Sequence, residues 1–213
     1  MDRPGYISRL IKSAVFPRFC ASCKAEGTLL CSPCASAWQP KPITSPQLVS
    51  SFNYADPIAR ELIRAWKYSL DATAWAHLQR KLGPAIDLLR SVVVDHAIEA
   101  IIPVPLHKQR KLERGFDQAE EIGTYLSEVL DVPMCPLLIR SRTTGSQTDR
   151  EMSDRVRAME DSPFRMRDDH DVPKRLLIVD DVYTTGATAK AAAQVLMNAG
   201  AEEIHFYTLA KGG

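Results

Sequence analysis

The sequence LLIVDDVYTTGAT, residues 176–188, decides the fold of this chain. Four apolar residues, typical of a buried strand, run directly into two acidic residues, Asp180 and Asp181, and a small-residue turn and an alanine-rich segment follow. Two adjacent carboxylates repel each other unless a cation or hydrogen-bond donors share their charge. The stretch therefore predicts a ligand at the end of a strand.

The turn after the acidic pair has the composition of an anion-binding helix start. N–H groups at the start of a helix lack an intrahelical partner and the helix dipole favours negative charge, so phosphate is the typical ligand. Gly186 allows close approach of the backbone, and the neighbouring threonines add donors. Asp180 and Asp181 can accept hydrogen bonds from hydroxyl groups or hold a hard cation. A ribose 5-phosphate carries both a phosphate and vicinal hydroxyls, so the stretch predicts a ligand of this kind.

Three other interpretations of the acidic strand end compete with this one. A receiver domain has a similar pair at its first strand, whereas Asp180 and Asp181 stand near the end of 213 residues. A nucleotide hydrolase needs the pattern G-x4-G-K followed by Ser or Thr, which this chain lacks. The third interpretation is a solvated strand end without a ligand, and the agreement of strand, acidic pair, turn and helix argues against it.

Strands and helices alternate in the second half of the chain. The patterns predict strand 97–105, helix 114–130, strand 136–141, strand 175–181, helix 186–200 and strand 203–210. This order predicts a parallel sheet with helices on both faces. In such sheets ligands bind at the carboxyl ends of the strands. The ends of strands 97–105 and 175–181 both meet this rule.

The first half of the chain contains clear helix signals. Asp56 and Pro57 are typical of an N-cap and a first helical residue. We expect helix 5–15, strand 49–54, helix 56–68 and a helical pattern over 71–89 that is broken at Gly83-Pro84. Prolines in the segment 38–47 indicate a linker. We therefore predict two domains, 1–47 and 48–213.

Four cysteines have the spacing C-x2-C-x7-C-x2-C, at Cys20, Cys23, Cys31 and Cys34. Each C-x2-C pair can offer two thiolates to one tetrahedral zinc ion. The alternatives are two disulfides or buried thiols, and a reducing compartment argues against disulfides. The remaining cysteine, Cys135, is expected to be a buried apolar residue.

Composition and charge indicate a globular protein. Apolar residues make up 45% of the chain, and 27 basic and 26 acidic residues give a net charge of +1, which does not mark a nucleic-acid binder. Arg9 and Lys12 interrupt the apolar N-terminal region, so we expect no signal peptide. No apolar run approaches the roughly 18 residues of a membrane helix. We therefore expect a cytoplasmic protein without membrane insertion.

Basic residues gather after strand 97–105. The segment LHKQRKLERG, residues 106–115, carries one histidine and four lysine or arginine residues against one acid. Such a cluster can hold a polyanion through charge-assisted hydrogen bonds, and the alternative is a solvated basic turn. Lys67 at the end of helix 56–68 is either a ligand contact or a cation favoured by the helix dipole. The polar segment 141–151 either closes over a ligand or is disordered.

Residues 176–188 resemble the ribose-phosphate signature of type I phosphoribosyltransferases, an apolar strand with two acidic residues and then T-T-G-x-T. More of the chain, about residues 20–211, resembles one branch, the competence protein F family of DNA-uptake proteins. The shared segments are the four-cysteine module, LIRAWKY (62–68), PVPLHKQRKLERGFDQA (103–119), a downstream segment with Thr, Gln and Arg, and the signature itself. The segment 103–119 distinguishes the branch.

The resemblance implies an α/β fold, a parallel-sheet type I phosphoribosyltransferase domain with a small N-terminal four-cysteine zinc module. It implies binding of phosphoribosyl pyrophosphate with Mg²⁺, displacement at the anomeric carbon by an acceptor that is unknown, and a role in DNA uptake and natural transformation. Asp180 and Asp181 would be catalytic and orient the ribose. The substrate-binding residues would be Tyr183, Thr184, Thr185, Gly186, Ala187 and Thr188 near the 5-phosphate, with Lys67, Lys108, Arg110 and Arg114, and the basic segment would face pyrophosphate.

A non-catalytic alternative stays open. The same pocket would sense a phosphoribosyl ligand, while the zinc module and the basic segments contact single-stranded DNA or a DNA-uptake helicase. The balanced charge argues against strong DNA affinity from electrostatics alone. Aromatic residues near basic ones, Phe19, Trp66 and Tyr68, leave base stacking open.

Two positions depart from the family pattern. Asp117 stands in RGFDQ where the family usually has Asn, and Asp161 and Ser162 stand where the family has an Asn-rich turn. Both departures exchange an amide for an acid or a hydroxyl near the expected site.

Overall fold

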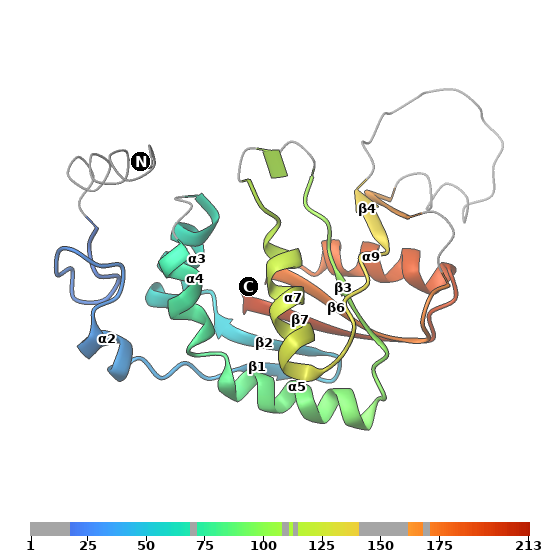
Figure 1. Ribbon diagram of the computed structural model, residues 1–213, viewed down its shortest axis with the longest axis horizontal. Helices are drawn as coiled ribbons and strands as arrows, with labels where there is room; N and C mark the ends of the chain where they lie inside the picture. Colours follow the sequence, from blue (N-terminus) through green and yellow to red (C-terminus); the bar gives the residue numbers. More distant parts are fainter. Residues whose placement is uncertain (1–17, 69–71, 108–110, 113–114, 141–161, 168–170) are drawn as a thin grey trace, which may run out of the picture. The chain divides into compact units, whose positions relative to one another are not determined.

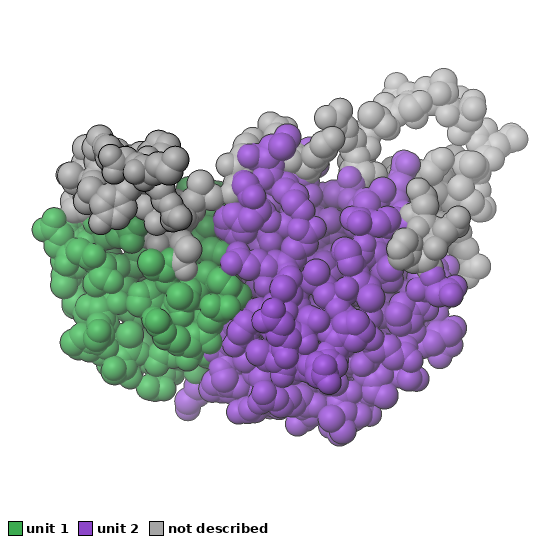
Figure 2. Space-filling view, viewed as in Figure 1, with its two compact units in different colours: residues 1–40, 55–81 green, residues 41–54, 82–213 purple. Residues whose placement is uncertain are grey.

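The structure is a computed structural model that describes residues 18–68, 72–107, 111–112, 115–140, 162–167 and 171–213 (Figure 1). The chain divides into two compact units, coloured separately in Figure 2. The first comprises Met1–Pro40 and Ala55–Lys81, and the second comprises Lys41–Tyr54 and Leu82–Gly213. The predicted helix 5–15 and the polar segment 141–151 lie outside the described residues. The boundary between residues 47 and 48 stays a prediction.

The second unit is built on a five-stranded sheet with the order β1-β2-β7-β6-β3 (Figure 1). Its strands are β1 (Ile43–Ser45), β2 (Leu48–Asn53), β3 (Ala100–Pro103), β6 (Arg175–Tyr183) and β7 (Glu203–Lys211). The β2–β7, β7–β6 and β6–β3 pairs are parallel, which confirms the predicted parallel sheet. The short strand β1 pairs antiparallel with β2 at the edge, so the prediction of a linker over 38–47 is wrong for residues 43–45.

Helices cover both faces of this sheet, as predicted. Helices α5 (Gly83–Asp95) and α7 (Gln118–Leu130) contact one face, and α9 (Ala187–Asn198) contacts the other (Figure 1). Alternation along β3 shows the two faces directly. Ile101 lies against Gly123 of α7, whereas Ile102 joins a cluster with Leu196 of α9.

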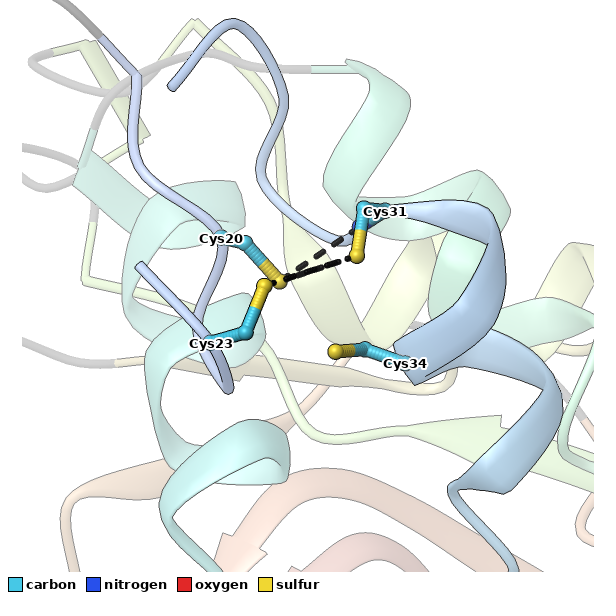
Figure 3. A group of neighbouring side chains, drawn as sticks. All are labelled: Cys20, Cys23, Cys31 and Cys34. Carbon is cyan, nitrogen blue, oxygen red and sulfur yellow. Dashed lines mark hydrogen bonds between the residues drawn. The ribbon is translucent and has the colours of Figure 1, made fainter. Parts of the chain in front are cut away.

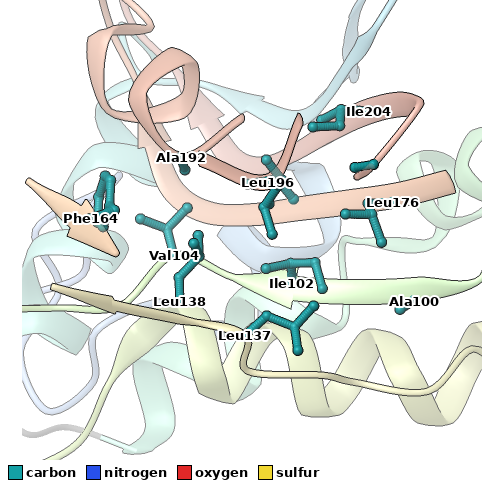
Figure 4. Close-up of a cluster of buried hydrophobic side chains, with 12 residues drawn as sticks. Ala100, Ile102, Val104, Leu137, Leu138, Phe164, Leu176, Ala192, Leu196 and Ile204 are labelled. Carbon is teal, nitrogen blue, oxygen red and sulfur yellow. The ribbon is translucent and has the colours of Figure 1, made fainter. Parts of the chain in front are cut away.

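The core between the sheet and α9 is a cluster of twelve buried residues (Figure 4). Its members are Ala100, Ile102, Val104, Leu137, Leu138, Phe164, Leu176, Ile178, Ala192, Leu196, Ala201 and Ile204. Burying each larger apolar side chain contributes about 1.5–3 kcal/mol, so this cluster fixes the position of β6 against α9. An antiparallel pair, β4 (Leu138–Arg140) and β5 (Phe164–Met166), supplies part of this core.

The first unit contains α2 (Ser32–Ala37), α3 (Pro57–Tyr68) and α4 (Ala72–Gln79). Asp56 caps α3, because its Oδ1 accepts hydrogen bonds from the N–H groups of Ile58 at 2.8 Å and Ala59 at 3.2 Å. The predicted start of this helix is therefore confirmed. Trp66 and Trp75 stack with ring centroids 4.8 Å apart, which fastens α3 to α4.

Two element boundaries differ from the sequence prediction. Helix α7 begins at Gln118 rather than at residue 114, because Asp117 caps it. Strand β6 runs on to Tyr183, two residues beyond the predicted end, because its pairing with β7 continues to Lys211. None of the helices within the described part of the chain combines the length and apolar character that crossing a membrane requires.

Candidate functional site

The acidic pair lies at the carboxyl end of β6, beside the carboxyl ends of β3 and β7. The backbone N–H of Asp181 donates to Oδ1 of Asp180 at 2.8 Å, and both side chains are half-buried. Because successive strand residues point to opposite faces, Asp180 lies on the face of Ile178 and α9, whereas Asp181 lies on the other face. The two carboxylates therefore lie on different faces of the sheet at the end of this strand.

A tight turn joins β6 to α9. Gly186 is the N-cap of α9 with φ of +76°, a left-handed conformation that favours glycine. A Cβ atom at this position would lie 2.6 Å from Cζ of Tyr183, so the Tyr183 ring packs directly over the glycine. The hydroxyl of Thr185 accepts from the N–H of Ala187 at 3.4 Å. Both the backbone and the packing therefore require glycine here.

A small, partly open hollow lies at this turn. Its lining comprises Asp180, Val182, Tyr183, Thr184, Thr185, Gly186, Ala187, Thr188 and Ala189. The structure thus brings together seven of the predicted site residues, while Asp181 is not part of this lining. Thr184 and Thr185 are exposed and lie at the mouth of the hollow. Donors and one carboxylate therefore surround a space at the start of a helix.

The ends of β2 and β7 complete the surroundings of the turn. The N–H of Gly212 donates to the carbonyl of Tyr183 at 2.8 Å, and the N–H of Tyr54 donates to the carbonyl of Lys211 at 2.8 Å. A Cβ on Gly212 would lie 3.5 Å from Cβ of Tyr54 and 3.6 Å from Cγ2 of Thr184. No local pattern in the sequence points to Tyr54 or Gly212, since only the pairing of β2 with β7 places them here.

Asp117 links the start of the basic segment after β3 to the start of α7. Its Oδ2 accepts from the N–H of Leu106 at 2.8 Å, and its Oδ1 accepts from the N–H of Ala119 at 3.1 Å. Burial raises the pKa of Asp117, which is 5% exposed. Lys111 pairs with Glu120. The predicted ligands Lys108, Arg110 and Arg114 lie outside the described residues.

Lys67 belongs to the first unit, where it lies half-buried in the last turn of α3. A cation is favourable at this position because the helix dipole is negative there. Its role as a substrate contact stays a prediction.

The four predicted cysteine ligands converge in the first unit (Figure 3). The Sγ of Cys31 lies 3.7 Å from that of Cys20 and 3.6 Å from that of Cys23, and all four sulfur atoms lie within 4.8 Å of one another. A tetrahedral zinc ion with Zn–S bonds of about 2.3 Å separates its sulfur ligands by about 3.8 Å. The cluster therefore has the chemistry and spacing of a zinc site.

Backbone donors prepare one of these thiols for ionisation. Burial alone would raise the pKa of Cys20, but N–H groups of Cys31, Cys23 and Ser22 hydrogen-bond to its sulfur and lower the pKa to about 6. At Cys31 the N–H of Cys34 has the lowering effect, yet hydrogen bonding to the Cys34 thiol and burial raise the pKa to about 12.

For one of the three aromatic residues considered for base stacking, the prediction of an available ring is wrong. Trp66 is 2% exposed and stacked on Trp75, so its ring is not accessible to a base. Phe19 is 50% exposed and Tyr68 is 69% exposed. Only these two of the three can offer a ring to a ligand.

Comparison with known proteins identifies relatives over most of the chain. Residues 116–213, which include β6, the turn and α9, match the phosphoribosyl transferase domain family. This match and the observed sheet topology confirm the predicted phosphoribosyltransferase fold. Among solved structures, purine phosphoribosyltransferase from Pyrococcus horikoshii Ot3 is 21% identical, with 64% of this chain and 75% of that chain covered and a TM-score of 0.40.

Two curated relatives extend the similarity to the first unit. Competence protein F of Haemophilus influenzae is 29% identical over 201 residues, which cover 92% of this chain and 85% of the relative. DNA utilization protein YhgH of Shigella flexneri is 30% identical over 196 residues, which cover 90% of this chain and 83% of the relative. The similarity therefore extends beyond the sheet-bearing residues 116–213 to most of the chain.

Proposed function

This chain belongs to the competence protein F family, and from this membership we propose that it binds phosphoribosyl pyrophosphate with Mg²⁺ at the carboxyl end of β6. We further propose that it acts in DNA uptake during natural transformation. The domain is phosphoribosyltransferase-like, and phosphoribosyl transfer to an acceptor is the activity that this ligand would support. The acceptor is not specified by the residues of the site.

The observation that supports this proposal most is the turn between β6 and α9. Gly186 has no side chain to fill the hollow at the start of α9, and the exposed residues Thr184 and Thr185 line this hollow. A helix start with free N–H groups favours a phosphate. We assign the 5-phosphate to residues 183–188 on this basis.

The acidic pair would accept hydrogen bonds from the ribose hydroxyls. Asp180 lines the hollow, and Asp181 lies on the opposite face of β6. Carboxylates accept hydrogen bonds from hydroxyl groups and also bind Mg²⁺, which would neutralise charge on a departing pyrophosphate. In a displacement at the anomeric carbon, the chain's own residues hold the ribose and exclude alternative orientations. The predicted pyrophosphate contacts are Lys108, Arg110 and Arg114.

Calorimetric titration of the full chain with phosphoribosyl pyrophosphate and Mg²⁺ tests this proposal. Asp180→Asn should weaken binding by roughly 1.5–3 kcal/mol, the range for hydrogen bonds to charged groups, because Asp180 is the carboxylate that lines the hollow. Asp87→Asn is the matched control, because Asp87 is an exposed acid on α5 that pairs with Arg90 at 3.0 Å. Unchanged affinity in a folded Asp180→Asn protein would contradict the proposal.

We also propose that the four-cysteine cluster holds one zinc ion. A tetrathiolate zinc site supplies folding energy to a small module. The sulfur spacing supports this assignment, and a cytoplasmic location, which we propose with it, keeps the thiols reduced.

A non-catalytic module that contacts single-stranded DNA or a helicase is the second candidate. One observation within the first unit favours it, a hollow lined by Leu30, Ser32, Ala35, Ser36, His77, Arg80 and Lys81. Hydroxyls and cations around a hollow suit the phosphates of a nucleic acid. Exposed Phe19 and Tyr68 can add stacking.

Two measurements separate these candidates. A transferase releases pyrophosphate when the correct base is supplied with Mg²⁺, whereas a binding module retains phosphoribosyl pyrophosphate unchanged. A DNA-binding module should bind an oligonucleotide with an affinity that falls as salt rises, and Arg80→Ala should reduce this slope by about one unit. Oligonucleotide binding that is independent of salt and of Arg80 would exclude the basic hollow as its site.

A further inference from the structure

Three metal-binding side chains gather at the start of β7, on the end of the sheet opposite to the acidic pair. They are His96, Glu203 and His205. Strand β7 begins at Glu203, whereas the acidic pair lies where β6 ends, so this cluster stands apart from the turn at Gly186. The proposed phosphoribosyl site uses none of these three residues.

Strand and helix geometry bring the three residues together. Glu203 and His205 are two positions apart on β7, so both point to the same face of the sheet. Ile204 between them points to the other face, where it joins the core cluster with α9. His96 is the C-cap of α5, which packs on the face of Glu203 and His205, and its N–H bonds the carbonyl of Val92 at 3.1 Å.

Both imidazole rings point to one carboxylate oxygen. The Nδ1 of His96 lies 2.7 Å and the Nε2 of His205 lies 2.9 Å from Oε1 of Glu203. The two ring centroids are 4.0 Å apart, and the three candidate ligand atoms all lie within 4.8 Å of one another. Two imidazole nitrogens and one carboxylate oxygen are therefore grouped closely enough to bind one ion.

The ion pairs of Glu203 are with the two histidines rather than with its neighbour Arg175. Arg175 is the cross-strand neighbour of Glu203 and would be its natural ion-pair partner. The Arg175 guanidinium instead bonds Glu99 at 2.8 Å and the carbonyl of Ala97 at 3.0 Å. The side chain of His205 is 4% exposed, while those of His96 and Glu203 are 39% and 38% exposed, so one side of the cluster is open to water.

We propose that His96, Glu203 and His205 form a second metal site, which binds Zn²⁺ through two imidazoles and one carboxylate with water as the fourth ligand. Two histidines and a glutamate with one open position are a common zinc ligand set. Ligands about 2.0–2.1 Å from zinc in a tetrahedron are about 3.3 Å apart, so the observed 2.7 and 2.9 Å need to open by only a few tenths of an ångström. The bound ion would link the end of α5 to the start of β7.

Zinc titration of the full chain tests this proposal, with the four-cysteine cluster already saturated. We expect a second equivalent to bind in the wild-type protein. His96→Gln and Glu203→Gln should each weaken this second event more than about 100-fold, since loss of an outer partner alone costs 10–100-fold. Both residues are more than one-third exposed, so these variants are expected to fold. The matched control is Glu202→Gln, which removes the same charge one residue away, where Glu202 pairs with Lys174 at 3.0 Å.

Cobalt distinguishes this site from the cysteine cluster. Co²⁺ in the second site should add no thiolate-to-metal charge-transfer absorption, because its ligands are nitrogen and oxygen. The absence of a second equivalent in the wild-type protein would overturn the proposal. Equal weakening by Glu202→Gln and Glu203→Gln would also overturn it, since the effect would then be general electrostatics.

Discussion

Adding a single methyl group at Gly186 should damage the turn in two separable ways. Alanine at φ of +76° is in the left-handed region, which costs about 1–2 kcal/mol. The new Cβ would also lie 2.6 Å from Cζ and 3.2 Å from Cε2 of Tyr183, and relieving such an overlap costs about 1–3 kcal/mol. We therefore expect Gly186→Ala to lower the free energy of unfolding by about 2–5 kcal/mol, much of the stability of a typical domain.

A matched glycine separates the backbone cost from the contact with Tyr183. Gly115 has φ of +75°, nearly the same as Gly186, but a Cβ there would meet nothing within 4 Å. Gly115→Ala should therefore cost only the backbone part, about 1–2 kcal/mol. In a Tyr183→Ala background, Gly186→Ala should cost a similar amount, because the ring that it displaces is gone.

Urea unfolding measures these free energies for the wild type, Gly186→Ala, Tyr183→Ala and the double variant, with Gly115→Ala as control. The double-mutant cycle should give a coupling of about 1–3 kcal/mol between Gly186 and Tyr183. A coupling near zero, or a Gly186→Ala protein as stable as the wild type, would refute the packing of Tyr183 over this turn.

Three further predictions concern other parts of the chain. Asp117→Ala should lower the free energy of unfolding by about 2 kcal/mol, since it leaves the N–H groups of Leu106 and Ala119 without their acceptor, and Asp117→Asn should cost less; urea unfolding checks both, and equal stability of all three proteins would contradict the anchoring role. Metal analysis should find one tightly held zinc that is lost in Cys23→Ser, and a Cys20–Cys23 or Cys31–Cys34 disulfide in freshly prepared reduced protein would contradict this assignment. N–H groups of Arg175 and Lys174 donate to the carboxylate of Glu99 and lower its pKa. The contribution of Glu99 to stability is therefore present above pH 4.5 and is lost as the pH falls through the lowered pKa. Glu99→Gln should make the thermal unfolding temperature depend less on pH in that acidic range, and an unchanged profile would rule out this contribution.

Local signals explain the parts of the fold that the sequence predicted well. Asp56 and Pro57 define the start of α3 because capping and proline geometry act within a few residues. The apolar run 176–179 predicts the interior strand β6 because a strand buried on both faces needs such a run. The four cysteines could be grouped because their spacing is itself a ligand pattern.

Long-range pairing explains what the sequence could not predict. Strand β1 has three residues in a proline-containing segment, and only its pairing with β2 reveals it. Trp66 looks available beside Lys67 in the sequence, but the stack on Trp75 buries it. Segment 55–81 groups with the cysteine segment although 41–54 separates them in the chain, and no local pattern carries that information.

The candidate sites also differ in whether local sequence signals or long-range pairing bring their residues together. Residues 180–188 are contiguous, so the hollow at the start of α9 was visible in the sequence apart from the ring of Tyr183 over Gly186. Asp180 and Asp181 alternate along β6, and only the packing of the sheet shows which of the two carboxylates lines the hollow. His96 meets Glu203 and His205 across more than a hundred residues, which is why no spacing motif indicated that cluster.

The most direct test of the phosphoribosyl site is an NMR titration of the isotopically labelled full chain with ribose 5-phosphate. We expect the backbone amide resonances of residues 184–188 to shift together with one dissociation constant, because their N–H groups would surround the 5-phosphate. The amides of Glu203 and His205, at the other end of β7, should remain unchanged. Shifts confined to other regions, with residues 184–188 unaffected at saturation, would show that the strand-end turn does not bind the phosphate.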